Sequence, residues 1–159
     1  MPRINVADDV SSWMALHPEL TAGLVAFSEA VYAKATKLSL RERELARMVI
    51  AHVNQCGVCI NTRRVVGPEQ GVTEDLYAQS LDWRGAQGLS VRERLAAEFA
   101  ERYARDHLAL NADDAYWARL HAAYSDPEIV ELSTCCALWL GAGRLPRVLD
   151  VGQSCSLLL

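Results

Sequence analysis

Two cysteines separated by two residues, Cys56 and Cys59, are the side chains with the clearest chemical potential in this sequence. In a helical setting, this spacing brings the two sulfur atoms close enough to form and break a disulfide with little backbone movement. A thiol near a helix N-terminus is acidified by the helix dipole, and the thiolate is the nucleophilic form. The pair therefore indicates thiol redox chemistry, and the structural alternative is two buried small hydrophobic side chains.

Three further polar side chains, Glu44, His52 and Arg63, have spacings that bring them near the two cysteines. Residues 54–55 indicate a break between one helix and a second helix that begins near Cys56, which places both sulfurs in its first turn. If the helix instead runs unbroken, all five side chains fall within about 120° of arc, at about 100° per residue. Both geometries predict that the five side chains gather on one side.

Each of these three polar side chains also has a structural interpretation. Glu44 ends a charged run, 41–44, and on that view is an exposed carboxylate paired with a neighbour such as Arg47. His52 lies on an apolar stripe, where a histidine is more often a core residue than a catalytic base. Arg63 carries a charge that complements the C-terminal end of a helix dipole.

The composition describes the kind of protein that holds these residues. The chain has 159 residues, a net charge of −4, 51% hydrophobic and 23% charged residues, which predicts one soluble globular domain with its own core. The acidic balance argues against nucleic-acid and membrane-surface partners, which need a concentrated positive field. We find no signal-peptide pattern or bilayer-spanning apolar run, so we expect a cytoplasmic protein. Five cysteines in that compartment favour thiol chemistry or burial over a fixed disulfide framework.

The residue types favour an all-α fold. Ala and Leu total 44 residues against 18 for Val and Ile, and β-branched side chains are the poorer helix formers. Capping-box patterns predict helix starts at Ser39, Ser90 and Ser125, each followed three residues later by Glu. Further helices are predicted over 18–35, 74–81 with Thr73 as cap, and 113–124 with Asn111 as cap. After Ser125, residues 132–140 are apolar on nearly every side, which is typical of a central or interface helix.

Two of the predicted helix starts have similar sequences. Residues 38–43 and 89–94 repeat each other at an offset of 51 positions. The repeat indicates either a duplicated helix pair or two good helix starts, and nothing downstream of the second copy repeats the cysteines.

Around Glu44 and the cysteines the sequence resembles a known family. A glutamate, eleven residues, a cysteine, two residues and a second cysteine are similar to part of the signature of the alkylhydroperoxidase D-like (AhpD-like) proteins, which include carboxymuconolactone decarboxylases. The match covers about residues 36–72, and the helical pattern is similar to about residue 150. The resemblance implies a single AhpD-like helical-bundle domain over residues 1–159 that forms homo-oligomers.

The resemblance also implies an activity and the role of each matching residue. Cys59 matches the thiol attacked by peroxide, Cys56 the thiol that resolves the sulfenic acid, and Glu44 the carboxylate that starts proton relay. The substrate would be a hydroperoxide or another small molecule, and an external dithiol or small redox protein would regenerate the pair. Neither a metal nor an organic cofactor is implied.

The sequence departs from the family pattern at two positions. The family signature has a histidine where this chain has Arg63, and well-studied members have another where this chain has Val58. Arginine cannot relay protons, because its pKa stays above about 12, although its charge can stabilise a thiolate. His52, one helical turn before Cys56, is the candidate for the missing proton shuttle.

These observations leave three functional hypotheses open. The first is a thiol-dependent peroxidase or disulfide oxidoreductase with an antioxidant role. The second is a cofactor-free decarboxylase-like enzyme on the same fold, whose activity survives loss of both cysteines. The third is a redox-silent or sensing oligomer, in which Arg63 marks lost catalysis.

The remaining cysteines have structural interpretations. Cys135 and Cys136 are expected to pack in the core, and the alternative is a zinc site shared with Cys56 and Cys59. Cys155 lies in an apolar C-terminal tail, residues 153–159, that we expect to dock on a neighbouring subunit. The other histidines and the tryptophans show no ligand spacing and are interpreted as structural.

Overall fold

The computed structural model describes all residues from 1 to 159, and it confirms the all-α prediction. The chain forms eight α-helices: α1 (Pro18–Lys34), α2 (Leu40–Asn54), α3 (Gly57–Asn61), α4 (Glu74–Gln79), α5 (Val91–Arg105), α6 (His107–Asn111), α7 (Asp114–Ala123) and α8 (Asp126–Leu149). Short 3₁₀ turns lie at Ser12–Leu16 (η1), Pro68–Gln70 (η2) and Ser80–Asp82 (η3). No helix is both long and apolar enough to cross a membrane.

The helix that leads to the cysteines begins at a capping box, as predicted. The Ser39 side chain accepts a hydrogen bond from the Glu42 backbone N–H, and the Glu42 carboxylate accepts one from the Ser39 N–H. Ser90 and Glu93 start α5 in the same way. Each box satisfies two backbone donors that the first turn leaves free.

The two similar helix starts also bind each other. The Arg41 side chain donates from Nε to Glu93 at 2.5 Å, and Arg92 donates from Nε to Glu42 at 2.6 Å. Each arginine of one copy thus binds the capping glutamate of the other, which fixes the start of α2 against the start of α5. Both copies are good helix starts, as one of the two interpretations held, and their pairing adds a tertiary contact.

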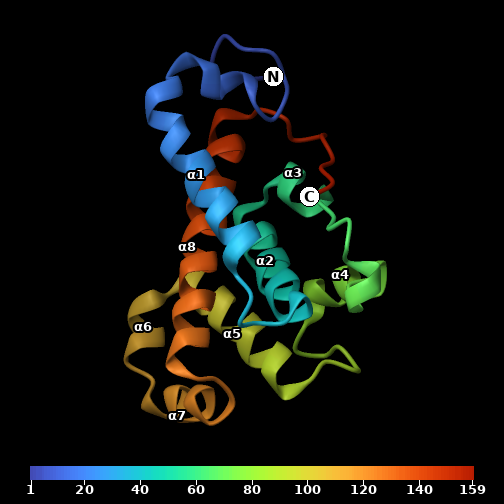
Figure 1. The fold of residues 1–159 in the computed structure, drawn as a ribbon, viewed down its shortest axis with the longest axis vertical. Coiled ribbons are helices and arrows are strands. Elements are labelled where there is room, and N and C mark those ends of the chain that lie inside the picture. Colours follow the sequence, from blue (N-terminus) through green and yellow to red (C-terminus); the bar gives the residue numbers. More distant parts are fainter.

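Helix α8 is the central element of the fold. It runs through the molecule with α1 and α2 beside it, and α5 also packs against it (Figure 1). Its apolar stretch is buried in the core, including Leu132, Cys135, Cys136 and Leu138. Of the two locations expected for this stretch, the structure shows the central one.

Two predicted caps differ from the structure. Asp113, not Asn111, caps α7, because its carboxylate accepts the Tyr116 backbone N–H at 2.9 Å. Residues 107–111 form the separate short helix α6, capped by Asp106. Thr73 stands at the N-cap position of α4, but its side chain makes no capping bond.

The C-terminal tail docks on its own chain in this structure, whereas its docking on a neighbouring subunit stays a prediction. The Arg63 N–H donates to the Leu157 carbonyl at 2.8 Å, and the Leu159 N–H donates to the Arg63 carbonyl at 3.0 Å. The N-terminal segment packs nearby on the end of α8, where the Arg3 N–H donates to the Leu149 carbonyl at 2.8 Å. Both chain ends therefore cover the region that holds α3.

Candidate dithiol site

The backbone breaks between α2 and α3, as the first of the two expected geometries requires. Gln55 adopts a left-handed conformation with φ of 52°, which ends α2, and Cys56 is the N-cap of α3. Cys56 and Cys59 form a disulfide with an S–S distance of 2.04 Å and a Cα–Cα distance of 5.2 Å. The Cys56 sulfur also accepts the Cys59 backbone N–H at 3.3 Å. The turn thus holds the two sulfurs in bonding position.

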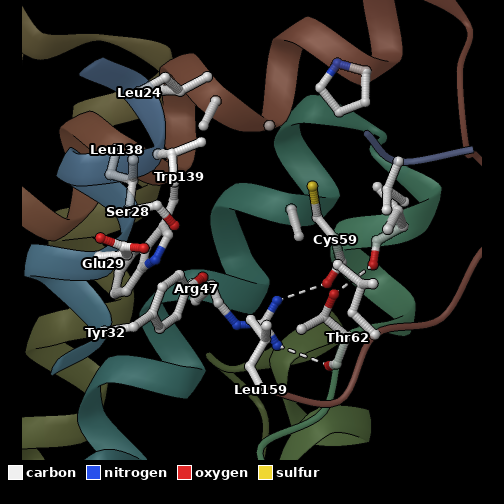
Figure 2. A pocket seen from close by; sticks show the side chains of 18 of the residues that line it. Leu24, Ser28, Glu29, Tyr32, Arg47, Cys59, Thr62, Leu138, Trp139 and Leu159 are labelled. Carbon is white, nitrogen blue, oxygen red and sulfur yellow. Dashed lines mark hydrogen bonds between the residues drawn. The ribbon is translucent and has the colours of Figure 1, made fainter. Parts of the chain in front are cut away.

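The two sulfurs have different surroundings. Cys56 is 0% exposed, beneath the turn that it caps. Cys59 is partly exposed and lines a cavity of about 300 Å³ (Figure 2). A small molecule in the cavity therefore meets the Cys59 sulfur first.

Two glycines allow neighbouring segments to approach the disulfide closely. A Cβ atom at Gly143 of α8 would lie 3.3 Å from the Cys59 sulfur and 2.8 Å from Asn54 Nδ2. A Cβ atom at Gly57 would lie 2.0 Å from the Gln153 carbonyl oxygen in the tail. Asn54 itself ties α2 to α8, since its amide nitrogen donates to the Trp139 carbonyl at 3.1 Å. These contacts fix α3 between α8 and the tail.

Glu44 is buried rather than exposed, at 2% relative exposure, and it is paired with Arg47 as the structural interpretation expected. Arg47 Nη2 lies 2.8 Å and Nε 3.0 Å from Glu44 Oε2. The Tyr77 hydroxyl donates to the same oxygen at 3.2 Å. Because all three contacts end at Oε2, Oε1 has no hydrogen-bond donor in the protein.

Arg47 links this carboxylate to the cysteines. Its Nη1 donates to the Cys59 carbonyl at 2.6 Å and its Nη2 to the Thr62 carbonyl at 3.1 Å, and the side chain also lines the cavity (Figure 2). Burial is the largest single influence on the pKa of Arg47 and lowers it, but the charge and hydrogen bond of Glu44, together with Tyr32 and Tyr77, raise that pKa overall. A buried cation therefore holds the C-terminal end of α3. Sequence reasoning named Arg47 only as an ion-pair neighbour of Glu44. The feature of the sequence that indicates this pair is the spacing of three residues between Glu44 and Arg47.

Arg63 does not line the cavity. Its guanidinium pairs with Glu74, with an Nε–Oε1 distance of 2.6 Å, and donates to the Ile60 carbonyl at 2.7 Å. The same group stacks on the Tyr77 ring at 4.2 Å from the centroid. Arg63 thus complements the C-terminal end of α3, and it contacts Glu44 only through Tyr77.

His52 also lies outside the cavity, although it shares α2 with Glu44. Its Nε2 is 3.3 Å from Ser80 Oγ, and that hydroxyl donates to the Tyr77 carbonyl at 2.6 Å. Since the hydroxyl proton is already used, Nε2 acts as the donor toward Ser80. Burial, helped by the positive charge of Arg47, lowers the pKa of His52. Of the five side chains expected at the site, Glu44 and the two cysteines are linked through Arg47. His52 and Arg63 bind Ser80 and Glu74 instead.

The cavity is mainly apolar. Hydrophobic residues make up 14 of its 20 lining residues, contributed by the N-terminal segment, α1, α2, α3, α8 and the tail. Representative apolar side chains are Trp13, Leu24, Val58, Leu138, Leu157 and Leu159. Of this lining, sequence reasoning identified only Cys59 as a site residue, because the members are spread from residue 10 to residue 159.

The other cysteines take no part in this site. Cys135 and Cys136 are buried and free, and burial raises the pKa of the Cys135 thiol to about 12. No group of three His, Cys, Asp or Glu side chains is arranged to hold a metal, so the alternative zinc site is not formed. Core packing is therefore the outcome for Cys135 and Cys136.

Comparison with known families explains this arrangement. The model of the carboxymuconolactone decarboxylase family matches residues 18–102, just over half of the chain. This chain belongs to the carboxymuconolactone decarboxylase family. The match includes α1 to α4, most of α5 and the whole Glu44–Cys59 segment, so the resemblance stated from the cysteine spacing is confirmed.

The chain is also similar in sequence to an uncharacterized bacterial protein. The uncharacterized Escherichia coli protein YnjA is 28% identical over 109 residues, which are 69% of this chain and 59% of YnjA. The chain thus spans less than two thirds of that relative's length.

Solved structures show that the AhpD-like fold extends over nearly the whole chain. The Agrobacterium tumefaciens protein ATU0492, of unknown function and described as a candidate antioxidant defence protein AhpD, has a TM-score of 0.76 at 19% identity over 94% of this chain and 96% of its own. An uncharacterized peroxidase-related protein from Ralstonia eutropha has a TM-score of 0.70 at 18% identity over 88% of this chain and 73% of its own. At such identities the likeness concerns the fold alone.

Proposed function

We propose that this protein is a thiol-dependent peroxidase that reduces hydroperoxides through Cys56 and Cys59. The observation that carries the proposal is the asymmetry of the pair: Cys59 faces an apolar cavity, and its disulfide partner Cys56 is fully buried behind it. Membership of the carboxymuconolactone decarboxylase family, which includes AhpD-like proteins, and the names of the structural relatives support it.

The reaction begins with both cysteines reduced. The Cys59 thiolate attacks the terminal oxygen of the hydroperoxide, the O–O bond breaks, and the alkoxide leaves and takes a proton to become an alcohol. Cys59 is then a sulfenic acid. The Cys56 thiol attacks its sulfur, loses a proton and releases hydroxide, which leaves as water. The products are the alcohol, water and the Cys56–Cys59 disulfide.

Glu44 accepts the proton that activates a thiol in this scheme. Its Oε1 has no protein donor, and Arg47 joins Glu44 to the backbone carbonyl of Cys59. A positioned carboxylate of this kind typically contributes about 10²–10⁴-fold to a proton-transfer step. We propose that Arg63 and His52 act indirectly, Arg63 by stacking on Tyr77 and His52 through Ser80.

Several further features belong to the same proposal. An external dithiol or a small redox protein returns the disulfide to the dithiol, and the protein works as a cytoplasmic homo-oligomer with an antioxidant role. Native mass spectrometry or light scattering measures the assembly state.

The decisive experiment follows peroxide consumption with excess dithiothreitol and maps disulfides by mass spectrometry. We expect wild type to turn over and to cycle through the Cys56–Cys59 disulfide, and Cys59→Ser to lose turnover. Cys155→Ser is the matched control, because Cys155 is a free thiol that does not line the cavity, and it should retain turnover. Full turnover in Cys59→Ser, or a wild type without disulfide or turnover, would refute the proposal.

A further inference from the structure

One wall of the cavity is polar, although the cavity as a whole is apolar. Four lining side chains, Ser28, Glu29, Tyr32 and Trp139, gather there; the Trp139 indole N–H is buried, whereas Glu29 is exposed to solvent. Figure 2 shows them on the side away from Cys59. Polar groups placed at one point of an otherwise apolar pocket typically orient a ligand.

Trp139 gives the clearest indication that this wall binds a polar group. The residue is 8% exposed, and its buried indole N–H has no acceptor apart from the Tyr32 hydroxyl, which lies beside it. Buried donors without partners are rare in folded proteins, because they lose their bonds to water. Trp13, in contrast, lines the same cavity but donates its N–H to the Val10 carbonyl at 3.1 Å.

The helix geometry places the polar wall within reach of a molecule that also touches Cys59. Ser28, Glu29 and Tyr32 occupy one turn of α1. Trp139 lies four residues before Gly143 on α8, and a Cβ atom at Gly143 would lie 3.3 Å from the Cys59 sulfur. Four helical residues rise about 6 Å, which is comparable to a chain of four or five carbon atoms.

The charges of the wall select the kind of group that it binds. Trp139, Tyr32 and Ser28 offer donors, and burial raises the pKa of Tyr32, which keeps its hydroxyl protonated. Glu29 adds an acceptor and a negative charge. Arg47 is the one cationic side chain in the cavity lining, and it already binds Glu44 and two carbonyls. The wall therefore favours an uncharged group with both an oxygen acceptor and a donor hydrogen, and it disfavours a carboxylate.

We propose that Ser28, Glu29, Tyr32 and Trp139 form a specificity subsite for an uncharged hydroxyl or carboxamide group of the substrate. The substrate is then a short apolar molecule with this polar group at one end. Its other end lies at Cys59, and the statement that this end carries a hydroperoxide rests on the proposed function. The subsite itself does not depend on the redox chemistry.

Binding of unreactive probes to the full-length protein tests the subsite. Three probes share one skeleton: 3-phenylpropan-1-ol carries the hydroxyl, propylbenzene lacks it, and 3-phenylpropanoate replaces it with a carboxylate. Calorimetry gives each dissociation constant without peroxide present. We expect Tyr32→Phe and Trp139→Phe each to weaken binding of the alcohol by about fivefold, the effect of one hydrogen bond, and to leave propylbenzene binding within about twofold.

Two further variants make the test specific. Trp13→Phe is the matched control, because its N–H is already bonded, and it should change the affinities of the alcohol and propylbenzene by the same factor. Glu29→Gln should strengthen binding of 3-phenylpropanoate by removing the repulsion.

The proposal is overturned if the alcohol does not bind, or if Tyr32→Phe affects the alcohol and propylbenzene equally. Tyr32→Phe keeps the proposal testable should Trp139→Phe fail to fold. Because the probes are unreactive and their binding is measured without peroxide, failure of the subsite and failure of the peroxidase activity give different results.

Discussion

Replacing Arg47 by methionine tests whether the buried ion pair organises the dithiol site. The Arg47 side chain is 4% exposed and Glu44 is 2% exposed, so Arg47→Met leaves a carboxylate buried without its cation. Removing one partner of a buried ion pair typically costs about 3–5 kcal/mol. The variant also loses the bonds that hold the Cys59 and Thr62 carbonyls. We therefore expect the free energy of unfolding to fall by about 3–5 kcal/mol, measured by urea denaturation of the oxidised protein.

A second substitution distinguishes the ion pair from simple packing. In Arg47→Met with Glu44→Gln, the uncompensated charge is gone, so the double variant should be more stable than Arg47→Met alone by about 1–3 kcal/mol. Arg63→Ala is the control, because Arg63 pairs with the exposed Glu74, and such surface pairs contribute about 0–1 kcal/mol. A loss below about 1 kcal/mol in Arg47→Met, or no recovery in the double variant, would show that the pair does not organise this site.

Two further predictions follow from the surroundings of the site. Gly143→Ala should lower the free energy of unfolding by about 1–3 kcal/mol, since its Cβ would meet Asn54 and the Cys59 sulfur. Gly141→Ala on the same helix is the control, because its Cβ would face open space and should not lower that free energy. Urea denaturation of both variants and wild type measures the difference. His52 has a pKa lowered below 6.5 by burial and by Arg47, so the unfolded chain binds its proton more readily and the protein should lose stability as the pH falls below about 6.5. An NMR titration locates this pKa, and His52→Asn should flatten the loss; a His52 pKa at or above 6.5 would contradict the assignment.

The sequence predicts the local features of this protein well, because they depend on neighbouring residues. The Ser39 and Ser90 caps and the break at residues 54–55 involve contacts within three or four positions, and all three are confirmed. The spacing of Glu44, Cys56 and Cys59 was enough to indicate the family, since the match depends on the order of residues alone. The predicted cap of α7, Asn111, was wrong, because Asp113 is a second polar candidate two residues later, and the short helix α6 was not predicted at all.

What only the tertiary structure decided is where each side chain points and what surrounds it. Helical spacing predicted that His52 and Arg63 lie beside the cysteines. In the structure His52 instead binds Ser80 and Arg63 binds Glu74, and both partners belong to later elements. The same spacing did not decide whether the Glu44 carboxylate is exposed or buried. Its burial depends on residues distant in the sequence, such as Tyr77, which donates a hydrogen bond to it.

The cavity shows most clearly the difference between what the sequence predicts and what the tertiary structure decides. Its walls combine the N-terminal segment, helices α1, α2, α3 and α8, and the tail, so no window of the sequence contains its pattern. The sequence by itself determined the helices, the dithiol and the family, because hydrogen bonds within a turn and residue order are local. The tertiary structure decided that Cys59 faces an apolar cavity and that Arg47 holds it there, because burial and ion pairing depend on segments distant in the chain.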